Sequence, residues 1–212
     1  RDQFGYQYGG RYFKIADQHD VNRLICGERE WAERSQQDLL NYWPKDEILF
    51  SHMTHQRQPL AQHGYTHWWK MFSSRQMLVL TQLFQVILSE HDPLRSHELR
   101  EQALGAFQQY LRNQNMFCFW DREYDKLVPM MSNANYHPKV QAIENSVFSK
   151  LGRGNWNTCT EKIIEGMEWL SDPWEKYALD SKTGGAKSEK LYSGDPVAGT
   201  SNLICGSSSA LS

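Results

Sequence analysis

Apolar residues recur with helical spacing along much of this chain, and proline or glycine stands at many of the breaks. The first such stretch follows Asp20 and is closed by Pro44, and the second begins at a helix-capping serine, Ser73 or Ser74. In the second stretch, apolar side chains occupy every face from Met77 to Leu88, which predicts burial against several neighbours. The predicted helices cover residues 20–44, 73–88, 96–116 and 159–179.

Short β segments are expected near both ends of the chain. Residues 4–16 mix aromatics with glycine, as in a hairpin or an extended entry, and residues 202–212 contain one short buried strand. Between the helices and that strand, residues 181–201 form a polar linker rich in glycine, serine and lysine. The predicted fold is therefore mainly α (α+β), a helical domain over residues 1–180 with short β segments at the N- and C-terminal ends.

Composition narrows the class of protein. The chain has 212 residues and 8 tryptophans, enough to build a real core. Mean hydropathy is −0.70, and we find no run that could span a bilayer and no signal peptide, so we expect a cytoplasmic protein. The 4 cysteines are widely spaced, which predicts free thiols in a reducing compartment. The missing initiator methionine suggests an excised fragment or a processed chain.

Nucleic-acid contact would have to come from a local patch, because the net charge is −2. Residues 126–156 are the best candidate, since basic groups that can hold phosphates alternate there with aromatic rings that can stack on bases. An ordinary surface loop is an equally good interpretation of this stretch. The candidate nucleic-acid-binding residues are Lys126, Tyr136, Lys139, Lys150, Arg153 and Trp156.

The pair Arg75–Gln76 falls in the first turn of the second predicted helix. Arginine reads guanine or phosphate and glutamine can pair with adenine, so both residues are further DNA candidates. The favoured interpretation is structural, with both side chains tying down the preceding loop by hydrogen bonds. Trp68 and Trp69 are expected in the core, because adjacent tryptophans seldom both stay exposed.

Catalytic and metal-binding signatures are missing. The histidines at positions 52, 55, 63 and 67 give an HxxH and an HxxxH, but a polar loop with solvated rings explains them better than a metal site. Phosphate-binding glycine loops, a nucleophile elbow and a cysteine–histidine signature are not found in the sequence. We predict no catalytic residue and no bound metal.

The order of several motifs resembles the adenine-specific DNA methylases often described as containing a zinc ribbon. Their aromatic-glycine turn and "W-x-x-[LM]-F-x-x-R-Q-L-L-x-L" helix are similar to Gly64, Trp68, Met71, Phe72, Arg75, Gln76, Leu78 and Leu80. A "L-R-x-N-N-M-x-C-x-W-D" stretch resembles residues 111–121, and a "Y-x-P-x-x-x-x-E-N" element resembles Tyr136 through Asn145, followed by the glycine-rich 152–154. Residues 204–211 resemble the strand and turn before the family's DPP[YF] motif.

The resemblance implies DNA as a partner and S-adenosylmethionine as the cofactor of the intact enzyme. That enzyme would methylate the exocyclic amine of a flipped adenine, as in DNA methylation by restriction–modification systems. The cofactor loop, the DPP[YF] motif and the zinc-ribbon cysteine pairs are missing from this chain. We therefore expect a DNA-handling or structural insert that is inactive alone and holds neither S-adenosylmethionine nor zinc. The alternative is a helical scaffold or protein-interaction module without nucleic-acid contact.

Overall fold

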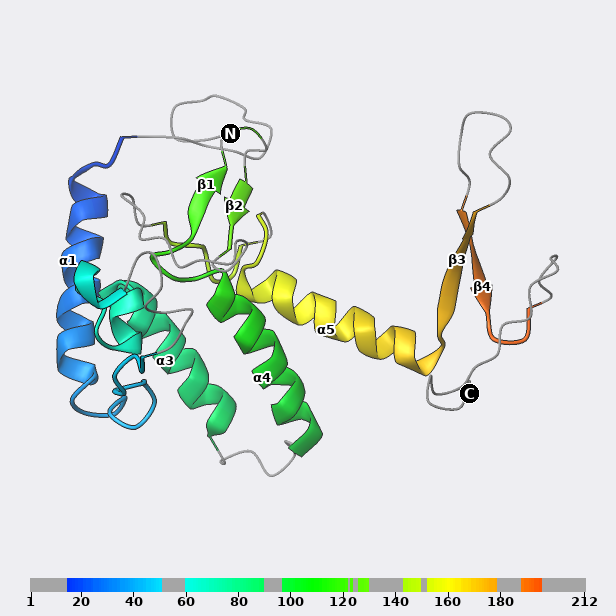
Figure 1. The fold of residues 1–212 in the computed structure, drawn as a ribbon, viewed down its shortest axis with the longest axis horizontal. Coiled ribbons are helices and arrows are strands. Elements are labelled where there is room, and N and C mark those ends of the chain that lie inside the picture. The colour runs from blue at the N-terminus through cyan, green and yellow to red at the C-terminus, as the bar shows by residue number, and fades with distance from the viewer. Residues whose placement is uncertain are drawn as a thin grey trace. The chain divides into compact units, whose positions relative to one another are not determined.

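The fold was analysed in a computed structural model, which describes residues 15–50, 60–89, 97–121, 123, 126–129, 143–149, 152–178 and 188–195 (Figure 1). The chain divides into two compact units, residues 1–164 and residues 165–212. Each unit is described by itself. Helix α5 begins in the first unit and ends in the second.

The first helix, α1 (Gln18–Arg34), is held at its start by a capping box between Asp17 and Asp20. It ends well before Pro44, where the sequence pattern had predicted its end. After Ser35 the chain turns back on itself, which buries Leu39 completely, and the indole of Trp43 donates to the Ser35 carbonyl at 3.1 Å. The helix therefore ends where the chain turns to bury Leu39 in the core.

Three further helices follow, as the periodicity predicts. Helix α3 (Ser74–Leu88) has Ser73 as its N-cap, and Gln76 completes a second capping box. Helix α4 (His97–Arg112) matches its predicted position closely. Helix α5 (Trp156–Ser171) is shorter than predicted, because Pro173 cannot continue a helix and the chain becomes extended after it. The short 3₁₀ turns η1 (Leu60–His63) and η2 (Trp68–Met71) precede α3.

Two small antiparallel hairpins complete the described structure. Strand β1 (Phe119–Asp121) pairs with β2 (Lys126–Val128), and β3 (Trp174–Ala178) pairs with β4 (Ser188–Tyr192). The predicted class, mainly α with short β segments, is confirmed. Strand β4 lies inside the stretch expected to be a flexible linker, and β1–β2 lies in mid-chain. The β segment expected at 202–212 falls outside the described residues, as does the one expected at 4–16 except for its last two residues, which are not in a strand.

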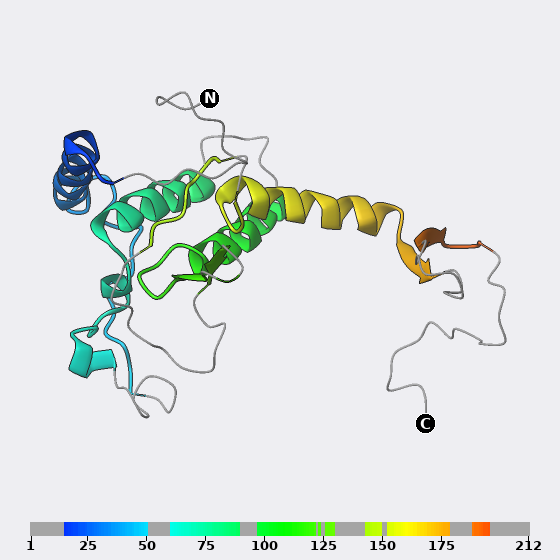
Figure 2. The ribbon, with the colours of Figure 1, turned by 90° about the horizontal axis from the view of Figure 1, so that it is seen from above.

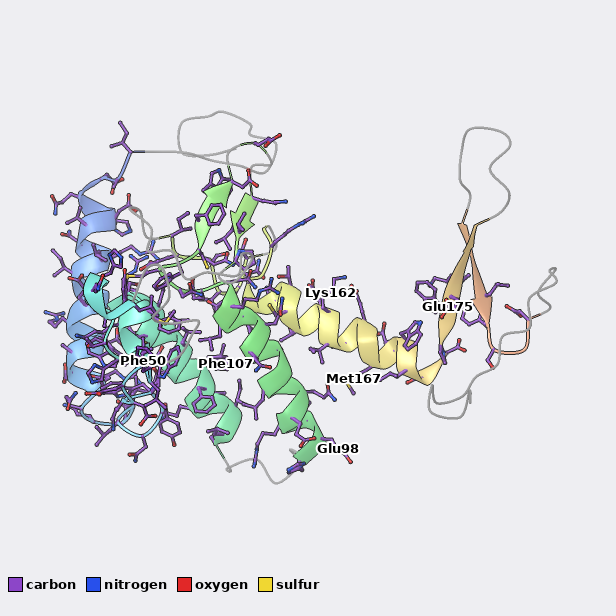
Figure 3. All side chains as sticks on the ribbon, in the orientation of Figure 1. Phe50, Glu98, Phe107, Lys162, Met167 and Glu175 are labelled. Atoms are coloured by element: carbon purple, nitrogen blue, oxygen red, sulfur yellow. The ribbon has the colours of Figure 1, made fainter. Side chains whose placement is uncertain are left out.

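The first unit has a core of three apolar clusters joined at one residue. Phe72 packs against all three of them. One cluster surrounds Trp31, the second lies between α3, α4 and the start of α5, and the third lies under η1 and η2. Phe107 of α4 stacks on Phe84 of α3 at 5.4 Å between ring centroids (Figure 3). The aromatic residues around α3 therefore join the helices of this unit.

The tryptophan pair before α3 was expected in the core, but both side chains are only partly buried and pack against the buried clusters. Trp69 packs against the cluster that contains Trp31, and Trp68 packs against the cluster under η1 and η2. Trp43 stands edge-on to both Trp31 and Trp69, with ring centroids 5.7 and 6.1 Å away. These edge-to-face contacts fix the turn after α1 against the start of α3.

In the second unit, the end of α5 leads directly into the β3–β4 hairpin. The Trp169 indole donates to the Trp174 carbonyl at 2.7 Å, which ties the helix end to the first strand. Across the hairpin, the Lys190 ammonium lies 4.1 Å from the Trp174 ring centroid. These contacts explain locally why residues within the expected linker form a strand.

Candidate functional site

An extended segment, residues 143–147, is held by a group of polar side chains that we call the clamp: Ser73, Arg75 and Gln76 at the start of α3, and Gln114 after α4. The segment is the yellow-green trace that passes α3 in both ribbon views (Figures 1 and 2). Ser73 donates from its hydroxyl to a Glu144 carboxylate oxygen at 2.7 Å, and Arg75 forms an ion pair with the other oxygen. Gln76 donates to the Ile143 carbonyl at 3.0 Å.

Gln114, just beyond the end of α4, contributes the most complete part of the clamp. Its amide oxygen accepts from the Asn145 backbone N–H at 2.6 Å, and its amide nitrogen donates to the Asn145 carbonyl at 2.8 Å. The same nitrogen also donates to the Tyr110 hydroxyl at 3.1 Å. One buried side chain, only 3% exposed, thus bonds both backbone groups of Asn145, as a neighbouring strand would.

The far end of the segment is joined to the start of α5. The side-chain amide of Asn145 donates to the Arg153 carbonyl at 3.0 Å, and the Trp156 backbone N–H donates to the Val147 carbonyl at 3.0 Å. Asn155 is fully buried, and its side chain accepts from the Thr158 backbone at 3.0 Å in the first turn of α5. Side chains at the start of α3 and just after α4, together with the start of α5, therefore hold residues 143–147.

The turn between the segment and α5 packs very closely against the residues that follow α4. Gly154 has a φ of +68°, and a Cβ there would lie 2.3 Å from the side chain of Asn113, next to the clamp residue Gln114. Only glycine fits such a position without strain. The glycine-rich turn after the segment is thus required by packing against the end of α4.

Two titratable groups near the clamp, Tyr110 and Cys159, have a raised pKa. Burial raises the pKa of Tyr110 to about 12, and burial also raises the pKa of the Cys159 thiol. Both groups are therefore protonated at neutral pH, and Cys159 lacks the lowered pKa of a nucleophilic cysteine. The geometry is suited to positioning a backbone segment.

Cavities lined by described residues adjoin this region of the first unit. A half-polar cavity of about 560 Å³ lies between α1, α3 and the segment, and Arg75, Glu144 and Asn145 line it. An apolar cavity of about 520 Å³ lies beside Trp43 and Phe72. A second apolar cavity, of about 600 Å³, lies between α3, α4 and the start of α5.

The site residues predicted from the sequence lie in different parts of the structure. Arg75 and Gln76 are engaged in the clamp, in agreement with the structural interpretation of that pair. Arg153 is exposed on the glycine turn, and Trp156 starts α5 with its ring edge-on to Tyr110. Lys126 lies partly buried on β2. The candidates outside the described residues are Tyr136, Lys139 and Lys150.

Sequence reasoning missed Ser73 and Gln114 as members of this site. Ser73 was expected only as a helix cap, but its hydroxyl also reaches Glu144. Gln114 fell within a stretch quoted only for its resemblance, and a single glutamine carries no signal that would reveal a partner 31 residues away.

The histidine loop forms no cluster in the part of the chain that is described. His52 and His55 lie outside the described residues, His63 is exposed, and a His67 ring nitrogen lies 2.9 Å from the Thr66 hydroxyl. Within the described ranges, no group of three or more histidine, cysteine or acidic residues could hold a metal ion. The searched helices are also too short or too polar to cross a membrane.

Fold and site together define a mainly helical domain that grips an extended segment through side-chain hydrogen bonds. Comparison of the chain with models of protein families, with curated proteins and with solved structures found no match.

Proposed function

We propose that this chain is a DNA-handling insert of an adenine-specific, S-adenosylmethionine-dependent DNA methyltransferase, and that the clamp presents residues 143–156 to DNA. The proposal rests on the fact that motifs from separate parts of the sequence meet at one site. Three of the stretches on which the methylase resemblance rests meet here: Arg75–Gln76 of the first and Gln114 of the second both bond residues 143–145 of the third. Motifs that are far apart in sequence thus act together to hold one segment of the chain.

The surface of the clamped region has side chains suited to nucleic acid. Phe148 is 70% exposed, and Arg153 is exposed on the adjoining turn. An exposed ring can stack on a base, and a guanidinium can hold a phosphate. In this proposal the clamp fixes the spacing of these two side chains, and Arg75 and Gln76 act as supports without touching DNA. The chain itself performs no chemistry.

The test measures binding of a fluorescent DNA duplex by anisotropy across a range of salt concentrations. Arg153→Gln should weaken binding and reduce the slope of log affinity against log salt by about 0.9, the value for one lost phosphate contact. Arg29→Gln removes the same charge from an exposed position on α1 and should leave the slope unchanged. The triple change Lys139→Gln, Lys150→Gln and Arg153→Gln should reduce the slope further.

The second candidate function is a helical scaffold or protein-interaction module. It is favoured by the internal use of Arg75 and Gln76 and by the overall charge of −2. A scaffold predicts no measurable DNA binding at low salt, by the wild type or by any variant. That result would remove the DNA-handling proposal, as would equal salt slopes for Arg153→Gln and Arg29→Gln.

A further inference from the structure

The apolar cavity beside Trp43 and Phe72, which we call the tryptophan cavity, has no role in the DNA proposal. Its volume is about 520 Å³, which falls within the range of small-molecule sites. The turn after α1, the η2 turn, α3 and α4 all contribute to its walls. Its described lining residues include no member of the clamp and neither Phe148 nor Arg153.

The walls of the tryptophan cavity are rich in aromatic rings. Its described aromatic lining residues are Tyr42, Trp43, Trp68, Phe72, Phe84 and Phe107, and none of its described lining residues is charged. An ion that entered would lose its hydration without gaining an opposite charge, which costs free energy. An aromatic molecule would gain the edge-to-face or offset-stacked contacts that ring pairs favour. The walls therefore select neutral molecules, and aromatic ones best.

One buried hydroxyl in the tryptophan cavity lacks a partner. Thr81 lines the cavity from α3 and is only 2% exposed, yet its hydroxyl forms no hydrogen bond with any residue that the structure describes. Among the described residues that are not exposed, the one unbonded side-chain nitrogen or oxygen with no accessible surface is Nε of Arg100, so the Thr81 oxygen can still be reached. Buried hydroxyls are usually bonded, because an unpaired one costs free energy.

We infer that the tryptophan cavity binds a small neutral aromatic molecule with one hydroxyl or N–H group, of the phenol or indole kind, and that this group bonds Thr81. A threonine hydroxyl accepts from such a donor through its lone pairs. Water can fill the place in the free protein, and the polar group of the ligand then replaces it without loss of the hydrogen bond. Apolar walls with one placed polar group are the usual design of a small-molecule site.

The test is calorimetric titration of the full chain into dilute β-naphthol, with naphthalene as the analogue that lacks the hydroxyl. Thr81→Val keeps the shape of the side chain and should weaken β-naphthol binding about fivefold, the usual scale of one neutral hydrogen bond. Naphthalene should bind Thr81→Val at least as tightly as wild type, because no unpaired hydroxyl is then buried beneath it.

Thr160→Val is the matched control. Thr160 is also a helical threonine, but its hydroxyl bonds the carbonyls of Trp156 and Asn157 on α5, and it does not line the tryptophan cavity. This variant should change the affinity for β-naphthol by less than about twofold.

A second measurement on the wild type locates the ligand without any variant. Nuclear Overhauser contacts from the ring protons of β-naphthol should reach the Thr81 methyl group and the Trp43 ring, and not the Trp156 ring, which lines the other apolar cavity. The inference is overturned if β-naphthol does not bind, if it contacts Trp156 instead, or if Thr81→Val binds it within about twofold of wild type. Its failure would leave the DNA proposal untouched, because the salt slope of Arg153→Gln does not depend on this cavity.

Discussion

Replacing Gln114 by methionine tests the clamp most directly. Methionine has nearly the same volume, so the change removes hydrogen bonds with little loss of packing. The Asn145 N–H and carbonyl then lose their partners at 2.6 and 2.8 Å. A buried group left unsatisfied costs about 1–3 kcal/mol, and we take the lower end because Asn145 is only partly buried. Two such groups give a loss of about 2 kcal/mol.

Equilibrium unfolding in urea, followed by tryptophan fluorescence, measures this loss. With a slope of about 2 kcal/mol per molar urea, the midpoint should fall by about 1 M. Gln109→Met is the matched control, because it makes the same substitution at an exposed position of α4. Hydrogen exchange at the Asn145 amide should accelerate in Gln114→Met and not in the control.

The reasoning fails if the two methionine variants differ by less than about 0.5 kcal/mol, the usual range for surface changes. It also fails if exchange at the Asn145 amide is unchanged in Gln114→Met. Either outcome would mean that the segment is held by packing alone, and that the reciprocal amide bonds contribute little.

Three further predictions concern the first unit. Gly27→Ala should lower the melting temperature, because its Cβ would lie 2.6 Å from Cγ of Arg75, which Glu144 holds in place. In the control Gly105→Ala the new Cβ would make only an ordinary contact with Ile163 at 3.8 Å, and the protein should gain about 0.5–1 kcal/mol. Gly154→Ala should cost at least about 2 kcal/mol in urea unfolding, since a left-handed φ and a collision add together. The raised pKa of Tyr110, about 12 against 10, stabilises the fold fully below pH 10. That stability should fall by about 1.4 kcal/mol per pH unit between pH 10 and 12, relative to Tyr110→Phe.

Elements with strong local signals could be predicted from the sequence. Helix α3 follows from a serine cap and a continuous apolar face, and α4 follows from one regular apolar stripe. The end of α5 was also predictable from Pro173, whose effect the apolar periodicity obscured. The end of α1 was not predictable, because it depends on burying Leu39 against residues of α3.

The clamp was harder to predict from the sequence than the helices were. The bonds of the clamp join residues 31 to 71 positions apart, and no spacing rule relates such positions. The structural interpretation of Arg75–Gln76 named the correct type of interaction, and Gln76 does bond the backbone N–H of Ser73 just before α3. The partners that the sequence did not reveal are Ile143 and Glu144, far along the chain. Strand β4 was missed because polar residues of a hairpin in the second unit have the composition of a linker.

The clamp also determines which positions of the segment are free to vary. Apart from the contacts of the Glu144 and Asn145 side chains, the bonds that hold residues 143–147 go to main-chain atoms, namely the Ile143 carbonyl, both backbone groups of Asn145 and the Val147 carbonyl. Substitutions at exposed Ser146 and Phe148 leave these bonds intact. Related proteins could therefore carry different side chains at these two positions while the same main-chain bonds hold the segment. The ligand that the segment binds could then change without loss of these bonds.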